Sequence, residues 1–139
     1  KTIVKNKSIV LIDDSLVRGT TCHKIVKMLY ENGAKEVHVR IACPEIKYPD
    51  FYGVDMPTKN ELLAYKKNNQ EMCDYIKAKS LKFLSLDGLY KALIGSKRNA
   101  SYPQFSDHYF TGDYPIKPSD NLQGLKIKQL SLLSGKSNN

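Results

Sequence analysis

The chain has 139 residues, a length that suits one domain and suffices to bury a hydrophobic core. Its net charge is +8, but scattered lysines carry most of it and only Arg18, Arg40 and Arg98 are arginines, so the clustering typical of nucleic-acid-binding proteins is missing. The sequence shows no apolar stretch of about 18 residues and no secretory signal, which predicts a cytoplasmic protein without membrane or nucleic-acid partners.

The spacing of the cysteines is also typical of a cytoplasmic protein. Cys22, Cys43 and Cys73 are far apart and form no C-x-x-C pair, so we expect buried thiols in a reducing cytosol and neither a zinc site nor a redox pair. The chain begins with Lys1 and not with Met, which indicates a cut fragment or a processed product.

The first predicted element is a strand that ends in two acidic residues. Ile9–Ile12 is an unbroken apolar run, typical of a parallel strand covered on both faces. Asp13 and Asp14 follow at its carboxyl end, where ligands of open α/β sheets collect. Adjacent carboxylates can accept hydrogen bonds from vicinal sugar hydroxyls or hold hydrated Mg2+.

The loop after the acidic pair has the composition of an anion-binding loop. Gly19 can take positive φ and lets the backbone approach an anion closely. Thr20 and Thr21 offer hydroxyl groups and can cap the following helix, whose first N–H groups would also face the anion. The same pattern also occurs in α/β proteins that bind nothing there. The predicted site for a phosphorylated sugar is Asp13, Asp14, Ser15, Leu16, Val17, Arg18, Gly19, Thr20 and Thr21.

Within this site Asp13 and Asp14 are also the predicted metal ligands. Ser15 has no predicted base beside it, so a nucleophilic role is not expected, and no catalytic residue is predicted.

A helix and a second strand follow. The helix is expected to run to about Asn32, with Gly33 as the glycine after its end. Apolar and polar residues alternate over 37–41, which predicts a strand parallel to the first. The apolar face of the helix repeats at helical spacing and consists of Cys22, Ile25, Val26 and Leu29.

The middle of the chain reads as an ordered loop and shorter elements. Residues 45–57 combine proline, glycine and the aromatic residues Tyr48, Phe51 and Tyr52, which we expect to serve packing. Thr58 and Glu61 form a predicted capping box for a helix to about Lys67. The remaining elements are a helix over 69–78, a strand over 81–84 and a helix over 86–94 that Ser85 caps.

The periodic patterns end after Gly95. Residues 96–139 are rich in Ser, Asn, Pro, Gly and Lys, so we expect an irregular extension whose last residues, 134–139, are disordered. Its aromatic residues are expected to hold part of it against the body; they are Phe105, Tyr109, Phe110 and Tyr114. Only two or three strands can form, which predicts at least one bare sheet edge.

The segment Val10–Thr21 resembles the ribose-phosphate signature of the type I phosphoribosyltransferases, in particular the glutamine phosphoribosyl pyrophosphate (PRPP) amidotransferase family. Further segments agree with this family in order, over 33–42, 49–55, 84–89 and 110–115, so the resemblance spans about residues 9–116. It implies an α/β fold that is a partial type I phosphoribosyltransferase (Rossmann-like) parallel sheet with flanking helices. Residues 1–95 would be the C-terminal portion of that domain, and residues 96–139 an irregular C-terminal extension.

The resemblance also implies a function. In that family the two acidic residues contact the ribose hydroxyls of PRPP and the loop holds its 5′-phosphate. Asp13 and Asp14 would then bind ribose and Mg2+ as cofactor, and Ser15–Thr21 the phosphate of PRPP or ribose 5-phosphate. The implied reaction is the first step of de novo purine synthesis, in which ammonia from glutamine displaces pyrophosphate from PRPP to give 5-phosphoribosylamine.

The family places further strands, a pyrophosphate loop and a glutaminase domain before the signature, and residues 1–8 hold none of them. We therefore expect the C-terminal fragment of such an enzyme, inactive alone, with an upstream glutaminase or transferase chain as partner and a homo-oligomer in the full enzyme.

Some family members hold an iron–sulfur cluster on cysteines. Asp50 stands at one of those positions and residues 103–109 contain no cysteine, so no cluster is expected. Two alternatives stay open, namely a PRPP-binding regulatory module and a non-functional gene remnant.

Overall fold

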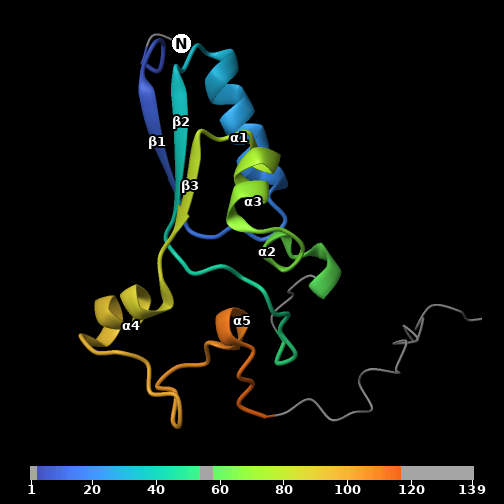
Figure 1. The fold of residues 1–139 in the computed structure, drawn as a ribbon, viewed down its shortest axis with the longest axis vertical. Helices are drawn as coiled ribbons and strands as arrows, with labels where there is room; N and C mark the ends of the chain where they lie inside the picture. The colour runs from blue at the N-terminus through green and yellow to red at the C-terminus, as the bar shows by residue number, and fades with distance from the viewer. Residues whose placement is uncertain (1–2, 54–57, 117–139) are drawn as a thin grey trace, which may run out of the picture.

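The computed structural model describes residues 3–53 and 58–116 and contains a three-stranded parallel sheet in the order β1-β2-β3 (Figure 1). The strands are β1 (Ser8–Asp13), β2 (Glu36–Ile41) and β3 (Ser80–Phe83). Leu11 is paired with Val39, which is paired in turn with Leu81. The predicted parallel β-α-β unit is confirmed, because α1 (Thr20–Glu31) connects the two parallel strands β1 and β2.

Helices α1 and α3 (Asn69–Ile76) lie on the same side of the sheet, with α2 (Leu63–Lys66) below them (Figure 1). The short 3-10 helix η1 (Lys59–Glu61) precedes α2. Helices α4 (Leu86–Ile94) and α5 (His108–Thr111) lie beyond the carboxyl ends of the strands. No helix among the described residues is long and apolar enough to cross a membrane.

The core lies between the sheet and the α1–α3 side. Val37, Val39 and Ile41 point from β2 to this side and are buried. They form one cluster with buried residues of both covering helices. The helical contributors are Cys22 and Val26 from α1 and Met72, Cys73 and Ile76 from α3.

The expectation that β1 is covered on both faces is wrong. Val10 is 59% and Ile12 is 72% exposed, because they point away from α1 and α3 to a face that no described helix covers. Within the described residues, β1 pairs with β2 alone, so the predicted bare edge is confirmed. An apolar run does not reveal which of its faces is covered, and here one face carries no second layer from the residues that the structure describes.

Two predicted helix starts need correction. The residue before α1 is Gly19, and no side chain caps the helix, so neither threonine serves as the cap. The predicted helix over 58–67 is split into η1 and α2, and Thr58 makes no side-chain cap bond. A capping box does form one helix later, because the Asn68 side chain accepts from the Glu71 N–H and the Glu71 carboxylate accepts from the Asn68 N–H.

Other helix boundaries agree with the sequence. The Ser85 side chain accepts from the Gly88 N–H at 3.0 Å, which confirms the predicted cap of α4. Gly33 has φ +88° just after α1, as a residue in the C′ position requires. Helix α3 ends earlier than predicted, because Lys77 takes the left-handed conformation.

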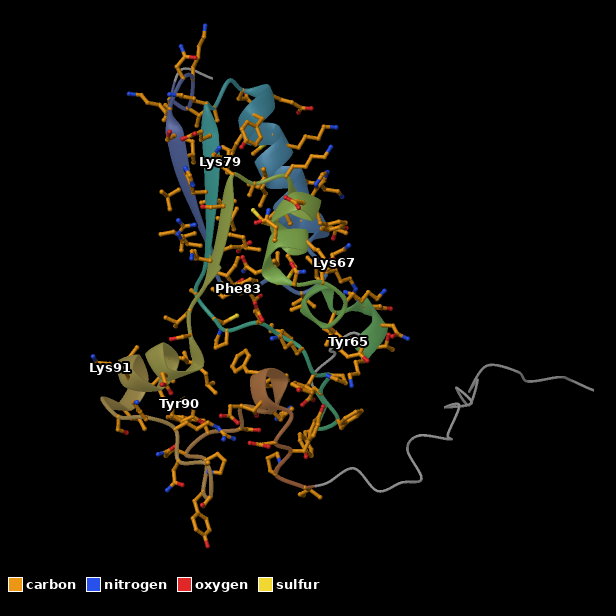
Figure 2. The ribbon with its side chains drawn as sticks, viewed as in Figure 1. Tyr65, Lys67, Lys79, Phe83, Tyr90 and Lys91 are labelled. Carbon is orange, nitrogen blue, oxygen red and sulfur yellow. The ribbon has the colours of Figure 1, made fainter. Side chains whose placement is uncertain are left out.

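The described part of the extension is folded onto the body, as predicted for its aromatic residues. Tyr90 of α4 donates to the Asp107 carboxylate at 2.7 Å, in the lower part of Figure 2. Arg98 bridges Asp107 and Asp113. Phe105 packs against the Tyr90 ring, and Tyr114 against Phe51. The prediction of disorder over 134–139 lies outside the described residues.

Candidate functional site

A cavity of about 300 Å³ lies where β1 ends and α1 begins. All nine residues that the sequence singled out, Asp13 to Thr21, line it, and Cys22 is the tenth lining residue. The folded chain therefore brings the two carboxylates, the loop and the start of the helix around one space.

The carboxylates of the acidic pair accept hydrogen bonds from the residues that follow each of them. The Asp14 N–H donates to the Asp13 carboxylate at 3.0 Å, and the Ser15 hydroxyl donates to the Asp14 carboxylate at 3.2 Å. The Asp13 carbonyl accepts from the Ala42 N–H at 2.9 Å, which ties the end of β1 to the residue after β2. Both carboxylates thus lie at the rim of the sheet, where hydroxyl groups of a ligand could donate to them.

Gly19 shapes the turn into α1. Its φ is +76°, a left-handed conformation that disfavours residues with a Cβ atom, and its carbonyl accepts the first helical bond from the His23 N–H at 2.9 Å. A Cβ atom here would lie 2.7 Å from Leu63 Cδ2 and 3.0 Å from Tyr75 Cε1. The glycine therefore allows both the conformation of the loop and its close contact with α2 and α3.

Residues far from the loop in sequence hold it in place, and the sequence did not predict them. The Leu63 N–H donates to the Val17 carbonyl at 2.8 Å, and Glu61 binds Arg18 with an N–O distance of 2.7 Å. The His23 ring bonds to the Tyr75 carbonyl at 3.0 Å. These contacts join residues more than forty positions apart, so no local pattern could have indicated them.

A second, more open hollow of about 400 Å³ lies at the ends of β2 and β3. Its lining includes Lys47, Lys82, Phe110 and a single acidic residue, Glu45, whose carboxylate lies 2.6 Å from Lys47. It lacks the paired carboxylates and the glycine turn of the first cavity, so the cavity at Asp13–Cys22 is the better candidate site.

Curated proteins are similar to this chain in sequence. No protein-family model matches the chain. The amidophosphoribosyltransferase of Rhizobium etli is 50% identical over 135 residues, which are 96% of this chain and 27% of the relative. That of Staphylococcus aureus strain Mu50 is 52% identical over 115 residues, which are 83% of this chain and 23% of the relative.

This chain is homologous to part of an amidophosphoribosyltransferase. It spans about a quarter of the length of the curated relatives it matches.

Solved structures agree with the assignment to the amidophosphoribosyltransferases. The glutamine PRPP amidotransferase of B. subtilis, complexed with ADP and GMP, matches with a TM-score of 0.75 at 45% identity. A structure described as the allosteric regulatory enzyme of purine biosynthesis matches with 0.71 at 42% identity. Each match covers 85% of this chain and about a quarter of the other. The parallel sheet and its helices are therefore part of a type I phosphoribosyltransferase fold.

The sequence predicts that Asp13 and Asp14 hold a metal ion. No group of three or more His, Cys, Asp or Glu residues within the described parts of this chain is placed to hold one. Asp13 and Asp14 are two adjacent oxygen donors, which fits a cation that takes one or two carboxylates and completes its shell with water and substrate.

Two cysteines lie near this site: Cys22 lines the cavity, and Cys43 lies close to Asp14 and Leu16. Burial and then the Asp13 charge raise the pKa of Cys22 to about 11, and burial and then the Asp14 charge raise that of Cys43 to about 11. At neutral pH both are therefore protonated, and a protonated thiol is a poor nucleophile and a poor metal ligand.

Proposed function

We propose that the cavity at Asp13–Thr21 binds the ribose 5-phosphate part of PRPP, and that this chain supplies that site to an amidophosphoribosyltransferase. The observation that carries the proposal is the gathering of the acidic pair, the glycine turn and the start of α1 around one cavity. The names of the relatives supply the reaction, in which an amino group is transferred to the phosphoribosyl unit.

The chemistry of the lining residues fits the two ends of this ligand. Asp13 and Asp14 would accept hydrogen bonds from the vicinal ribose hydroxyls, as carboxylates do. The backbone N–H groups and hydroxyls of Ser15–Thr21 would bind the 5′-phosphate, helped by the positive end of the twelve-residue helix α1. The ribose would thus be fixed from both ends beside the sheet.

Mg2+ is the cation that we propose for Asp13 and Asp14. Two carboxylates with the remaining positions left to water and substrate oxygens match its preference. When bound, the ion would neutralise charge on the pyrophosphate leaving group. The role of this chain is to orient the ribose and its phosphate. Positioning and electrostatic stabilisation can accelerate a displacement that needs no protein nucleophile.

The rest of the activity belongs to polypeptide outside this chain. The relatives are about four times longer, so we infer that further polypeptide carries the glutaminase function and the pyrophosphate site. We propose residues 1–95 as the phosphoribosyltransferase portion and 96–139 as an extension, in a cytoplasmic homo-oligomer when complete. Isolated, the chain is expected to bind ribose 5-phosphate with little or no turnover.

The test is a titration of the 139-residue chain with ribose 5-phosphate and Mg2+, followed by calorimetry. Asp13→Asn with Asp14→Asn should abolish the binding heat, because an amide offers weaker acceptors and no charge. The matched control, Asp74→Asn with Asp87→Asn, removes two exposed acids that do not line the cavity and should bind as wild type. Equal affinity of the Asp13/Asp14 variant and the control would refute the proposal.

A coupled assay with PRPP, ammonia and Mg2+ measures turnover separately. Rates at the level of a blank are expected for the isolated chain. Robust formation of 5-phosphoribosylamine by these 139 residues would show that they need no further polypeptide.

A further inference from the structure

Charge is unevenly distributed on the wall of the cavity. Asp13 and Asp14 supply two negative charges, and Arg18 is the one cation among the lining residues, all of which are described. A sugar phosphate brings further negative charge into this space. Arg18 is therefore the side chain on the wall whose position matters most for the phosphate.

The Arg18 guanidinium is bonded to a carboxylate in the structure. Its Nε and Nη2 atoms both donate to the same oxygen of Glu61, at 3.1 Å and 2.7 Å. The two side chains are 56% and 48% exposed, so water screens the pair and the bond is weak enough to exchange.

Glu61 is held beside the loop independently of Arg18. It ends η1, and two residues later the Leu63 N–H donates to the carbonyl of Val17, the neighbour of Arg18. Leu63 is also buried against the loop glycine. The backbone of Glu61 thus stays beside the loop when the guanidinium leaves its carboxylate.

We propose that Glu61 is a positioning residue that competes with the phosphate of the ligand for the Arg18 guanidinium. This inference rests on the proposed function, because it assumes that the cavity takes a phosphate. Before the sugar phosphate binds, Glu61 neutralises and holds the Arg18 guanidinium. When the sugar phosphate binds, its phosphate replaces Glu61 as the partner of this guanidinium. Glu61 therefore lowers the affinity of the cavity for the sugar phosphate. Because the phosphate must displace Glu61, this affinity also depends on the charge of the phosphate.

The experiment is a calorimetric titration of the 139-residue chain with ribose 5-phosphate at low ionic strength. Glu61→Gln should bind about two- to fivefold more tightly than wild type, the range that an exposed ion pair supports. Glu31→Gln removes another exposed carboxylate of an ion pair, at the far end of α1, and should leave the affinity unchanged.

Two further measurements separate competition from a merely structural effect. In an Arg18→Gln background, Glu61→Gln should give no gain, because no guanidinium is left to release. The gain in the single variant should shrink as salt is raised to 0.5 M, since ions screen exposed charges.

The outcomes are distinguishable. If wild type binds ribose 5-phosphate but Glu61→Gln binds equally or more weakly, the competition is refuted while the proposed function stands. A gain that persists without Arg18 also refutes it. If wild type binds no ribose 5-phosphate, both the proposed function and this inference are refuted.

Discussion

Two constraints, one of backbone conformation and one of space, favour glycine at position 19. Its positive φ costs a residue with a Cβ atom about 1–2 kcal/mol, and the added atom would also lie 2.7 Å from Leu63 Cδ2 and 3.0 Å from the Tyr75 ring. Leu63 and Tyr75 belong to the elements behind the loop, so a shift of either is transmitted to the wall of the cavity.

We expect Gly19→Ala to lower the free energy of unfolding by at least about 1–2 kcal/mol and to weaken binding of ribose 5-phosphate. Gly95→Ala is the matched control, because Gly95 has φ +70° and open space around its missing Cβ atom. Denaturant unfolding should show a loss for both variants, and calorimetry a loss of affinity for Gly19→Ala alone. Wild-type affinity of Gly19→Ala would show that the close contact does not shape the site.

Asp107 links stability to pH. Burial opposes its ionisation, but hydrogen bonds from Arg98 and then Tyr90, with the Arg98 charge, hold its pKa below the ordinary value of 3.8. A carboxyl with a lowered pKa in the folded state adds stability above its unfolded pKa, and this contribution is lost as the pH falls through the folded pKa.

The folded chain should therefore lose stability below about pH 4, and Asp107→Asn should reduce this loss. Denaturant unfolding at pH 6 and pH 3 measures the slope of the free energy of unfolding against pH for wild type and for Asp107→Asn. Asp87→Asn, at an exposed acid of α4, is the control and should keep the wild-type slope. Identical slopes for Asp107→Asn and wild type would contradict the assignment.

At the scale of elements, residues 45–53 and 106–116 hold each other. The Tyr109 carbonyl accepts from the Lys47 and Tyr48 N–H groups at 2.9 Å and 3.1 Å. His108 Nε2 lies 2.8 Å from the Asp50 carboxylate, and both side chains are almost fully buried. The rings of Tyr52 and Tyr114 pack beside His108. The described extension is therefore part of the folded body.

We predict that His108→Ala lowers the free energy of unfolding by about 3 kcal/mol, because the buried Asp50 carboxylate loses a short hydrogen bond to a group that can carry charge. Lys27→Ala, which breaks an exposed pair at 3.7 Å, should cost at most about 0.5 kcal/mol. Thermal and urea unfolding measure the free energy of unfolding of both variants. Equal, small losses would show that the pair is not structurally important.

How far the elements could be predicted depends on whether their causes are local. Helix α4 agrees with its predicted bounds of 86–94, since Ser85 caps it through its own neighbour Gly88. The helix at Glu61 was mispredicted because this carboxylate binds Arg18, 43 positions away, and does not cap its own helix. The gathering of Asp13–Thr21 follows from a strand running into a helix, but the backing by Leu63 is non-local and left no sequence signal.

At the scale of the molecule, the described part of the chain covers one face of the sheet and leaves the other open. Val10 and Ile12 stand exposed on the open face, beside polar residues of β2 and β3. Such a face and the bare edge of β1 favour self-association.

Replacing both residues by threonine, which is also β-branched, should leave stability within about 0.5 kcal/mol and reduce association measured by sedimentation. Val39→Thr, at a buried position of β2, should instead cost about 1–3 kcal/mol. If the double variant were destabilised as strongly as Val39→Thr, the open face would have to be covered in solution.

The edge strand β1 is also the strand that delivers Asp13 to the cavity. A polypeptide that added itself along β1 would come to lie next to the cavity at Asp13–Cys22. If this polypeptide also contacts the proposed sugar phosphate, binding of the ligand and binding of the neighbouring polypeptide should each promote the other.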